Sequence, residues 1–459
     1  MSPRIMPRIM IAGTASGSGK TTVTCAIMRA LVKRGLKLSP FKCGPDYIDP
    51  LFHSAVTGRE SGNLDTFLFS ENTARYLLAK NSEGADISII EGVMGYYDGT
   101  GPAGTIASTY ATAAATKTPV LLVLNCKGMA MSAAAIIKGF LTFKENSYIA
   151  GAVLNNVSIS VYPQLKQTIE NEFGIKVFGM LPKLPEDCIF ESRSMGLLSP
   201  AEQENFYAKL DALAEIAEKN IDLDSLLETA AKAEDFIYTK PNVKHSWRKG
   251  QKGQKGQKIK IALAKDKAFC FIYRDNINLL IEMGAEIAFF SPLKDSSLPS
   301  GISGLILPGG YPELYLKELS GNKPLLNDIY KKLAEGLPCI AECGGFMYIN
   351  RSIEGQKMLG FLDADCFKTD KLVRFGYITM TAKKDNLLCK AGDMINAHEY
   401  HYFDCEKPGS DYTAIKPSGV KWQSAFARDN LYAGYPHIHF YSNLDFAHNF
   451  YEKCSKAVY

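Results

Sequence analysis

The chain has 459 residues, of which 46% are hydrophobic and 22% are charged. This length exceeds one ordinary core and predicts two or three domains, and the composition is typical of a soluble globular protein without large-scale disorder. The formal net charge is only +4, from 52 basic and 48 acidic residues, and part of the excess lies in one short lysine-rich stretch. Nucleic-acid binding therefore has little support.

Cysteine usage and the absence of long apolar runs bear on where the protein works. Eleven cysteines are scattered along the chain without CxxC pairs or a secretory leader. This arrangement favours reduced thiols in the cytoplasm over a disulfide framework. No apolar run approaches the roughly 18 residues that a membrane-spanning helix needs, so we expect no membrane partner. The repeated letters PRIM at the start lead straight into a strand and indicate a duplicated start without a function.

Short apolar runs alternate with helical patterns from Arg8 to about Pro185. Four runs are rich in β-branched and aliphatic residues, as expected of strands buried on both faces: RIMIAG, ISIIEG, PVLLVLN and YIAGAVLN. This pattern predicts a doubly wound α/β domain with a mostly parallel sheet. Apolar positions at helical spacing follow from about Ser199 to Ala233, and we expect this domain to cover residues 1–239.

Residues 240–258, KPNVKHSWRKGQKGQKGQK, contain three KGQ repeats without an apolar residue inside them. They predict a solvated, flexible linker. A basic tether for an acidic partner is the weaker alternative, because the run is short and lacks interleaved aromatic residues. A second alternating pattern begins with IKIALAKD and reaches PCIAECGG, which predicts a second doubly wound α/β domain over residues 259–459.

The segment GTASGSGKTT, Gly13–Thr22, predicts a phosphate-binding loop. Its spacing is one residue longer than the common Walker A pattern, but a strand precedes it and a helix follows it, as such a loop requires. Glycines let backbone N–H groups turn toward phosphates, Lys20 brings a charge to the outer phosphates, and Thr21 offers a hydroxyl to Mg²⁺. A Gly/Ser turn that caps a helix is the weaker alternative to an ATP site. The expected nucleotide-binding residues are Gly13, Thr14, Gly17, Ser18, Gly19, Lys20, Thr21 and Thr22.

Mg²⁺ needs hard oxygen ligands beyond one hydroxyl. Asp46 in KCGPDYIDP and Glu91 in IIEGVMGYYDG are candidates at strand ends, with Asp49 and Asp98 just beyond them. Acidic residues that end buried strands lie at the carboxyl edge of an α/β sheet, where ligands bind. For Asp46 and Asp49, turn formation beside the neighbouring prolines is the alternative. Glu91 follows four apolar residues and needs a partner.

The segment AECGG, Ala341–Gly345, follows a strand-like run and precedes FMYI, a helical start. A nucleophile on a tight strand-to-helix turn projects outward, and the helix N-terminus favours its thiolate. We expect Cys343 to be this nucleophile and His437, in YPHIHF, to be its base. Backbone N–H groups of Gly310, in LPGGYPELY, and of Gly344 are the expected oxyanion donors. A structural role for the histidine is the alternative.

The segment HEYH, His398–His401, has the HxxH spacing of some zinc sites. It lacks a second cluster and the HExxH spacing of helical zinc proteases. We therefore expect a structural or substrate-facing role and no zinc. The remaining cysteines are expected to be buried core residues.

The motifs KCGPDYIDP, EGVMGYYDG, LPGGYPELY, AECGGFMYI, HEYHY and HIHF stand in an order and spacing that resemble the cobyrinate a,c-diamide synthase family over nearly the whole chain. The resemblance implies a dethiobiotin-synthetase-like, P-loop ATP domain and a cobalamin-type class I glutamine amidotransferase domain. It implies that Cys343 attacks the amide of L-glutamine with the help of His437, and that ammonia passes to the ATP domain. There a carboxylate of cobyrinate attacks the γ-phosphate of ATP, and ammonia converts the acyl phosphate to an amide, first at c and then at a.

The resemblance also implies roles for acidic residues. Asp46, Glu91 and Asp98 match the family's positions for Mg²⁺, nucleotide and intermediate handling, so Thr21, Asp46 and Glu91 are the expected metal ligands and Asp98 joins the nucleotide site. In ordinary class I triads a glutamate lies two residues after the histidine. Here His439 occupies that position, which leaves the third member of the site open. A homodimer is compatible with the resemblance.

Three other classes of function stay open. A nucleotide switch of the partitioning-ATPase type shares such phosphate loops but does not need Cys343. A plain glutaminase or cysteine hydrolase does not need Gly13–Thr22. Within the family, a synthase that acts on hydrogenobyrinate or Ni-sirohydrochlorin has the same chemistry, although EGVMGYYDG favours the cobyrinate branch.

Overall fold

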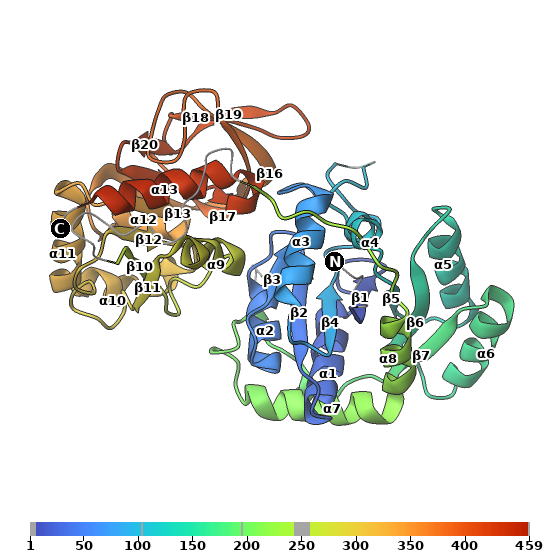
Figure 1. Ribbon diagram of the computed structural model, residues 1–459. Helices are drawn as coiled ribbons and strands as arrows, with labels where there is room; N and C mark the ends of the chain where they lie inside the picture. The colour runs from blue at the N-terminus through green and yellow to red at the C-terminus, as the bar shows by residue number, and fades with distance from the viewer. Residues whose placement is uncertain (1–5, 102–103, 194–195, 243–257, 458–459) are drawn as a thin grey trace. The chain divides into compact units, whose positions relative to one another are not determined.

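The computed structural model describes residues 6–101, 104–193, 196–242 and 258–457, which form two compact units (Figure 1). The units divide between Pro241 and Asn242. This boundary falls inside the expected linker of residues 240–258, most of which lies outside the described residues. No helix in the described part of the chain is long and apolar enough to cross a membrane.

The N-terminal unit is built on a seven-stranded sheet in which every neighbouring pair is parallel. Its strands are continuous apolar runs because both faces are covered by helices. In spatial order they are β3 (Gly62–Leu64), β2 (Leu38–Cys43), β4 (Ile87–Glu91), β1 (Arg8–Gly13), β5 (Val120–Asn125), β6 (Ile149–Asn155) and β7 (Lys176–Leu181).

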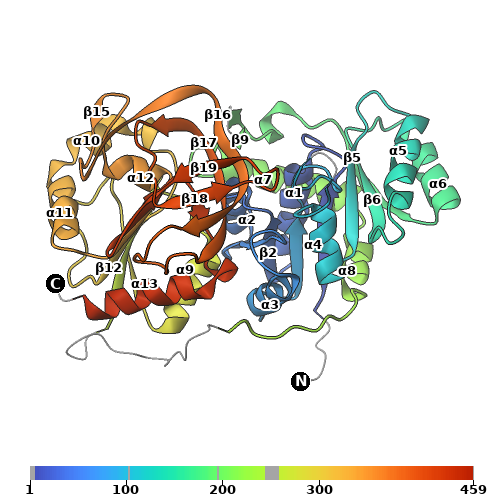
Figure 2. The ribbon, with the colours of Figure 1, turned by 90° about the horizontal axis from the view of Figure 1, so that it is seen from above.

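Helices cover the two faces of this sheet in separate groups. One core joins the sheet to α1 (Lys20–Lys33), α2 (Ile48–Thr57), α7 (Phe206–Asn220) and α8 (Leu223–Ala231). A second core joins β5, β6 and β7 to α5 (Met131–Thr142) and α6 (Tyr162–Phe173), which lie together beside β6 in both views (Figures 1 and 2). The remaining helices, α3 (Glu71–Asn81) and α4 (Thr109–Thr116), contact each other. A short 3-10 turn and a two-stranded hairpin precede α7: η1 (Glu186–Cys188), β8 (Ser192–Arg193) and β9 (Gly196–Leu197).

The C-terminal unit contains a six-stranded sheet that is parallel except at one edge. Its spatial order is β11 (Glu286–Phe290), β10 (Lys260–Ala264), β12 (Gly304–Leu307), β13 (Cys339–Glu342), β21 (Leu431–Gly434) and β20 (Phe426–Arg428). One face packs on the helices α10 (Leu316–Gly321), α11 (Lys323–Ala334) and α12 (Gly344–Ile349), and the 3-10 turn η3 (Pro312–Leu314) contacts α10 and α12. Helices α9 (Arg274–Met283) and α13 (Leu444–Lys456) contact each other. Cys454 of α13 lies against Gly304 of β12, whereas the next residue, Leu305, belongs to the core formed with α10, α11 and α12. Because successive residues of a strand face opposite sides, α13 packs on the other face of this sheet.

A second sheet in this unit is mainly antiparallel. It consists of β15 (Gln356–Lys357), β14 (Asn350–Ile353), the long β16 (Leu362–Ala382), β17 (Met394–Cys405) and β22 (His437–Ile438). In addition, β18 (Tyr412–Ile415) pairs with β16, and β19 (Lys421–Ser424) pairs with β18. The 3-10 turn η4 (Phe440–Ser442) follows β22. Because β22 comes directly after β21, the chain passes from one sheet to the other just before His437.

The predicted α/β class of both units and the mostly parallel N-terminal sheet are confirmed. The antiparallel sheet is an addition that the sequence analysis did not include. After the exposed Met394, β17 alternates between buried and half-buried residues, the period of a strand with one covered face. Two of its buried positions carry Glu399 and His401, so the alternation of apolar and polar residues in the sequence is broken there.

Candidate active site

The segment Gly13–Thr22 forms the turn between β1 and α1, at the carboxyl edge of the parallel sheet. Gly17 and Gly19 have φ angles of 76° and 91°, which glycine adopts without strain. Gly19 also lies against Asn155, whose side-chain amide donates to the Ser18 carbonyl at 3.0 Å, so a larger residue would collide there. The Thr14 amide donates to the carbonyl of Val123 on β5. Hydrogen bonds therefore hold the loop against β5 and β6.

Lys20, Thr21 and Thr22 occupy the first turn of α1, where free backbone N–H groups attract anions. Lys20 Nζ donates to the carbonyls of Ala15 at 3.2 Å and of Met94 at 2.6 Å. Burial, and next the charge of Lys42, lower the pKa of Lys20 to about 8. The Lys20 ammonium thus lies over the loop. A phosphate charge beside it would favour its protonated form.

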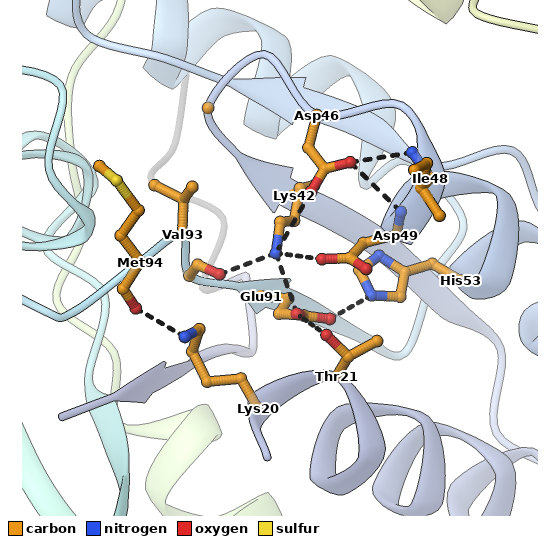
Figure 3. Close-up of polar contacts among 12 residues, drawn as sticks. Lys20, Thr21, Lys42, Asp46, Ile48, Asp49, His53, Glu91, Val93 and Met94 are labelled. Atoms are coloured by element: carbon orange, nitrogen blue, oxygen red, sulfur yellow. Dashed lines mark hydrogen bonds and ion pairs between the residues drawn. The ribbon is translucent and has the colours of Figure 1, made fainter. Parts of the chain in front are cut away.

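A buried cluster of charged residues lies beside this turn (Figure 3). Glu91, fully buried at the end of β4, accepts a hydrogen bond from Thr21 Oγ1 at 2.7 Å and contacts His53 Nε2 at 2.6 Å. Lys42 Nζ, on β2, lies 2.9 Å from Glu91 Oε1 and 2.6 Å from Asp49 Oδ2. Burial alone would raise the pKa of Glu91, but Lys42 and His53 hold it below its ordinary value. Glu91 therefore carries its charge in the interior.

The two aspartates after β2 have different surroundings. Asp46 Oδ1 accepts hydrogen bonds from the amides of Ile48 at 2.8 Å and of Asp49 at 3.4 Å, so it shapes the turn that begins α2. Its other oxygen lies 4.0 Å from Lys42 Nζ. Asp49 approaches the cluster more closely than Asp46. The structure thus brings Thr21 and Glu91 into direct contact and leaves Asp46 at the edge, where a metal-ligand role stays a prediction.

Asp98 is exposed and lies in the loop after β4. Its Oδ2 accepts a hydrogen bond from the Gly95 amide at 2.9 Å. The Tyr96 amide donates to the carbonyl of Gly13 at 2.8 Å, which holds this loop against the phosphate loop. The predicted nucleotide residue Asp98 therefore stands on a segment adjacent to the other predicted residues, although its own role stays a prediction.

The donor set of the cluster is suited to Mg²⁺. Among the residues that the structure describes, no group of three or more His, Cys, Asp or Glu side chains is arranged to hold a metal ion alone. Mg²⁺ in nucleotide sites commonly uses one or two protein oxygens together with phosphates. Thr21 and Glu91 supply two such oxygens beside the loop. The buried Ser18 hydroxyl, which has no hydrogen-bond partner among the described residues, fits a phosphate oxygen.

Cys343 lies between β13 and α12 in a strained conformation, with φ 46° and ψ −103°. Its amide donates to the Gly434 carbonyl at 2.8 Å, which fixes the turn against β21. Strain of this kind at a non-glycine residue is typical of a nucleophile held on a sharp strand-to-helix turn. The elbow that the sequence predicts is thus formed.

His437 is buried on β22 and is hydrogen-bonded to the Cys343 side chain. Its Nδ1 lies 3.5 Å from Glu342 Oε2. Burial alone would lower the pKa of His437, but Cys343 and Glu342 have the larger opposite effect and raise it to about 10. The predicted pair Cys343 and His437 is therefore brought together from two different sheets, with a carboxylate on the far side of the imidazole ring.

The turn Pro308–Gly310 after β12 lies against both Cys343 and His437. A Cβ atom at Gly309 would lie 2.4 Å from His437 Cε1 and 3.4 Å from Cys343 Cβ, so only glycine fits between them. A Cβ atom at Gly344 would lie 3.1 Å from the Gly310 nitrogen. The two predicted oxyanion donors, Gly310 and Gly344, are therefore neighbours; their role in binding an oxyanion stays a prediction.

The histidines of HEYH lie on β17 and not on a helix. Residues three apart in a strand point to opposite faces, and accordingly His401 is buried while His398 is half-buried. His401 stacks on Tyr435 with ring centroids 3.9 Å apart and contacts Glu399 Oε2 at 3.2 Å. His398 pairs in register with His437. The two histidines thus lie on opposite faces of β17, and a structural or substrate-facing role for them stays a prediction.

Two charged residues in these sites were absent from the sequence analysis. Lys42 stands inside a buried strand, and its partners come from β4 and α2, so nothing local marks it. Glu342 is visible beside Cys343, but its contact with His437 depends on the pairing of β13 with β21. In both cases the signal lies in the fold rather than in spacing along the chain.

Two family models match the two units of the chain. Residues 9–197 match the family model described as a CobQ/CobB/MinD/ParA nucleotide binding domain. Residues 260–444 match the model described as a CobB/CobQ-like glutamine amidotransferase domain. A nucleotide-binding unit and a glutamine amidotransferase unit on one chain define a glutamine-dependent amidating ligase.

Relatives that share both units are similar over nearly the full length. The cobyrinate a,c-diamide synthase of Clostridium acetobutylicum is 41% identical over 96% of this chain and 99% of its own. That of Caldanaerobacter subterraneus is 40% identical over 97% of this chain and 98% of its own. That of Priestia megaterium is 38% identical over 98% of this chain and 97% of its own. The chain belongs to the cobyrinate a,c-diamide synthase family.

Proposed function

We propose that the protein amidates the a and c side-chain carboxylates of cobyrinate at the expense of ATP, with L-glutamine or ammonia as the nitrogen donor, in corrinoid biosynthesis. The observation that carries the proposal is the presence of both half-sites on one chain, Lys20 with Thr21 and Glu91 in one unit and Cys343 with His437 in the other. The names of the relatives support the choice of cobyrinate. The reaction then belongs in the cytoplasm, where Cys343 stays reduced.

The glutamine half of the proposed reaction releases ammonia. The Cys343 thiolate attacks the side-chain amide carbon, and the resulting oxyanion is stabilised by the amides of Gly310 and Gly344. His437 gives its proton to the departing nitrogen, so that ammonia leaves and a thioester remains. Water then hydrolyses the thioester to glutamate and restores the thiol, with His437 accepting a proton from that water.

The ATP half prepares the carboxylate. One carboxylate oxygen of the substrate attacks the γ-phosphorus, the bond to ADP breaks, and an acyl phosphate forms. Lys20 offsets charge on the phosphates during the transfer, while the amides of the phosphate loop hold them. Thr21 and Glu91 would hold Mg²⁺, with Asp46 as a further candidate, and the ion supplies neutralising charge to ATP when bound. Ammonia then attacks the acyl carbon and inorganic phosphate leaves.

Each half supplies what the other lacks. A carboxylate is a poor electrophile because it carries a negative charge and has no good leaving group. Phosphorylation removes that obstacle. Ammonia in solution is largely protonated near neutral pH, whereas ammonia released from glutamine within the protein is available as a nucleophile. A nucleotide switch would not require Cys343, and a simple glutaminase would not require Lys20.

The test uses the whole protein with ATP, Mg²⁺ and glutamine, and compares cobyrinate, hydrogenobyrinate and Ni-sirohydrochlorin as substrates. Conversion of each carboxyl group to a carboxamide lowers the mass by one unit. We expect two such steps with cobyrinate and glutamate formed in proportion. Preference for either other tetrapyrrole would replace the proposed substrate, and failure with all three would refute the proposal.

A further inference from the structure

The carboxylate of Glu342 has a position that no known role in this chain explains. Glu342 is the last residue of β13, directly before the elbow, and pairs in register with Gly434 of β21. The chain leaves β21 at Gly434 and reaches His437 three residues later. The parallel pairing of β13 with β21 therefore brings His437, in the segment after β21, close to the carboxylate of Glu342 at the end of β13.

Both oxygens of this carboxylate contact the segment that carries the base. Glu342 Oε2 lies 3.5 Å from His437 Nδ1, and Oε1 accepts a hydrogen bond from the Ile438 amide at 3.1 Å. One carboxylate thus contacts the ring of the histidine and also the backbone just after it. His437 is also hydrogen-bonded to the Cys343 side chain, so its ring contacts both the thiol and the Glu342 carboxylate.

The charges around His437 single out Glu342. The titratable groups that face the imidazole are Cys343 and Glu342 from the elbow and His398 from β17. Burial, and next the charge of His437, lower the pKa of His398 to about 3, so that this neighbour is neutral. Glu342 is therefore the carboxylate that stabilises a charged His437.

His439, two residues after His437, serves a different purpose. Its Nδ1 accepts a hydrogen bond from the Tyr441 amide at 3.3 Å, and its ring lies 4.8 Å from that of Tyr273. Burial lowers the pKa of His439 to about 3, so it is neutral. A neutral ring that holds the turn η4 cannot stabilise an imidazolium by charge.

Glu342 is one of the residues that line a small pocket. It has a volume of about 30 Å³ and is lined mainly by apolar side chains, among them Phe271, Ile306 and Ile340. A space of this size accommodates about one water molecule. The Glu342 side chain is only 12% exposed, so its charge depends largely on its contacts with His437 and Ile438.

We propose that Glu342 is the positioning carboxylate of the glutaminase site, supplied by the residue before the nucleophile instead of by the position after the histidine. It orients His437 and favours its protonated form without touching glutamine. This inference rests on the proposed role of Cys343 and His437 in glutamine hydrolysis.

The test measures glutaminase activity against pH for the full chain and its variants. Glu342→Gln keeps the shape and removes the charge, so His437 loses its proton at lower pH. We expect the basic limb of the profile to move down by at least about one pH unit, because an opposite charge at such a distance shifts a pKa by one to three units. The rate should fall by about 10²-fold, with the KM for glutamine changed less than about twofold. His439→Asn, which keeps an acceptor for the Tyr441 amide, should leave the basic limb in place.

A second variant guards against a folding defect. Glu342→Ala joins the space of the missing side chain to the pocket, which makes room for formate. Formate should raise the glutaminase rate of Glu342→Ala and move its basic limb back toward that of the wild type, but should do neither for the wild-type protein. A basic limb that stays at the wild-type pH in Glu342→Gln, or the absence of any formate effect in Glu342→Ala, would overturn the inference. If the wild-type protein itself hydrolyses no glutamine, the proposed function fails first.

Discussion

The hydroxyl of Thr21 donates a hydrogen bond to Glu91 Oε1 at 2.7 Å, which ties the first turn of α1 to the carboxylate that ends β4. The same oxygen of Glu91 accepts from Lys42, and its other oxygen contacts His53. A fully buried carboxylate keeps its charge only with such partners. We therefore expect Glu91 to couple phosphate binding to the integrity of the sheet edge.

Replacement of Glu91 by Gln tests this coupling. The change removes the charge that Lys42 and His53 face, and breaking a buried pair costs about 3 kcal/mol of stability. We expect a lower unfolding temperature and the loss of both glutamine-dependent and ammonia-dependent amidation, with glutaminase activity retained. Glu83→Gln, at an exposed position of the same unit, is the matched control. Undiminished ammonia-dependent amidation in Glu91→Gln would contradict the assigned position of the ATP site.

Lys20 predicts a proton uptake that accompanies ATP binding. Its pKa is lowered to about 8 by burial and by Lys42, so above that pH a substantial share of the side chain is neutral. Phosphate oxygens favour the ammonium form and raise this pKa, so ATP binding near pH 8.5, on the order of half a unit above the free pKa, should take up protons. Calorimetry in buffers with different ionisation enthalpies measures the uptake.

The control for this prediction is Lys20→Arg. A guanidinium stays protonated across this range, so the variant should bind ATP, if it binds at all, without that uptake. Equal proton uptake by Lys20→Arg and the wild-type protein would assign the proton to another group.

Gly309 predicts a separation between the two nitrogen sources. In Gly309→Ala the new methyl group would lie 2.4 Å from His437 Cε1, so the imidazole must move away from Cys343. We expect the loss of glutamine-dependent amidation by more than about 10²-fold and the retention of ammonia-dependent amidation. Gly321→Ala, at the end of α10 with open space around its Cβ position, should behave as the wild type. Equal loss with both nitrogen sources would show that the variant has a wider defect.

Local patterns predicted much of this fold because the signals are local. The run RIMIAG coincides with β1, and the helix expected from Lys20 is α1, since the phosphate loop fixes both boundaries. The apolar strands were recognisable because helices cover both faces of a parallel sheet. By contrast, β16 and β17 pair at long range with two shifts of register, and no short motif encodes that pairing.

The candidate sites divide in the same way. The sequence predicted Cys343 and His437 from an elbow and a remote histidine, and the structure brings them together. It could not predict Lys42 or Glu342, because each acts through partners on other strands. Asp46 illustrates the opposite limit: an aspartate near a strand end reads as a ligand, yet one of its oxygens accepts hydrogen bonds from backbone amides of its own turn.

The most direct test of the division of labour is amidation of cobyrinate by Cys343→Ala, with either glutamine carrying a heavy isotope in its amide nitrogen or free ammonia as the donor. The wild-type protein should transfer the label into both new amides. Cys343→Ala should transfer none of it, yet should amidate cobyrinate with free ammonia at a rate close to that of the wild type. Transfer of the label by Cys343→Ala, or the loss of ammonia-dependent amidation in this variant while it remains folded, would contradict the account.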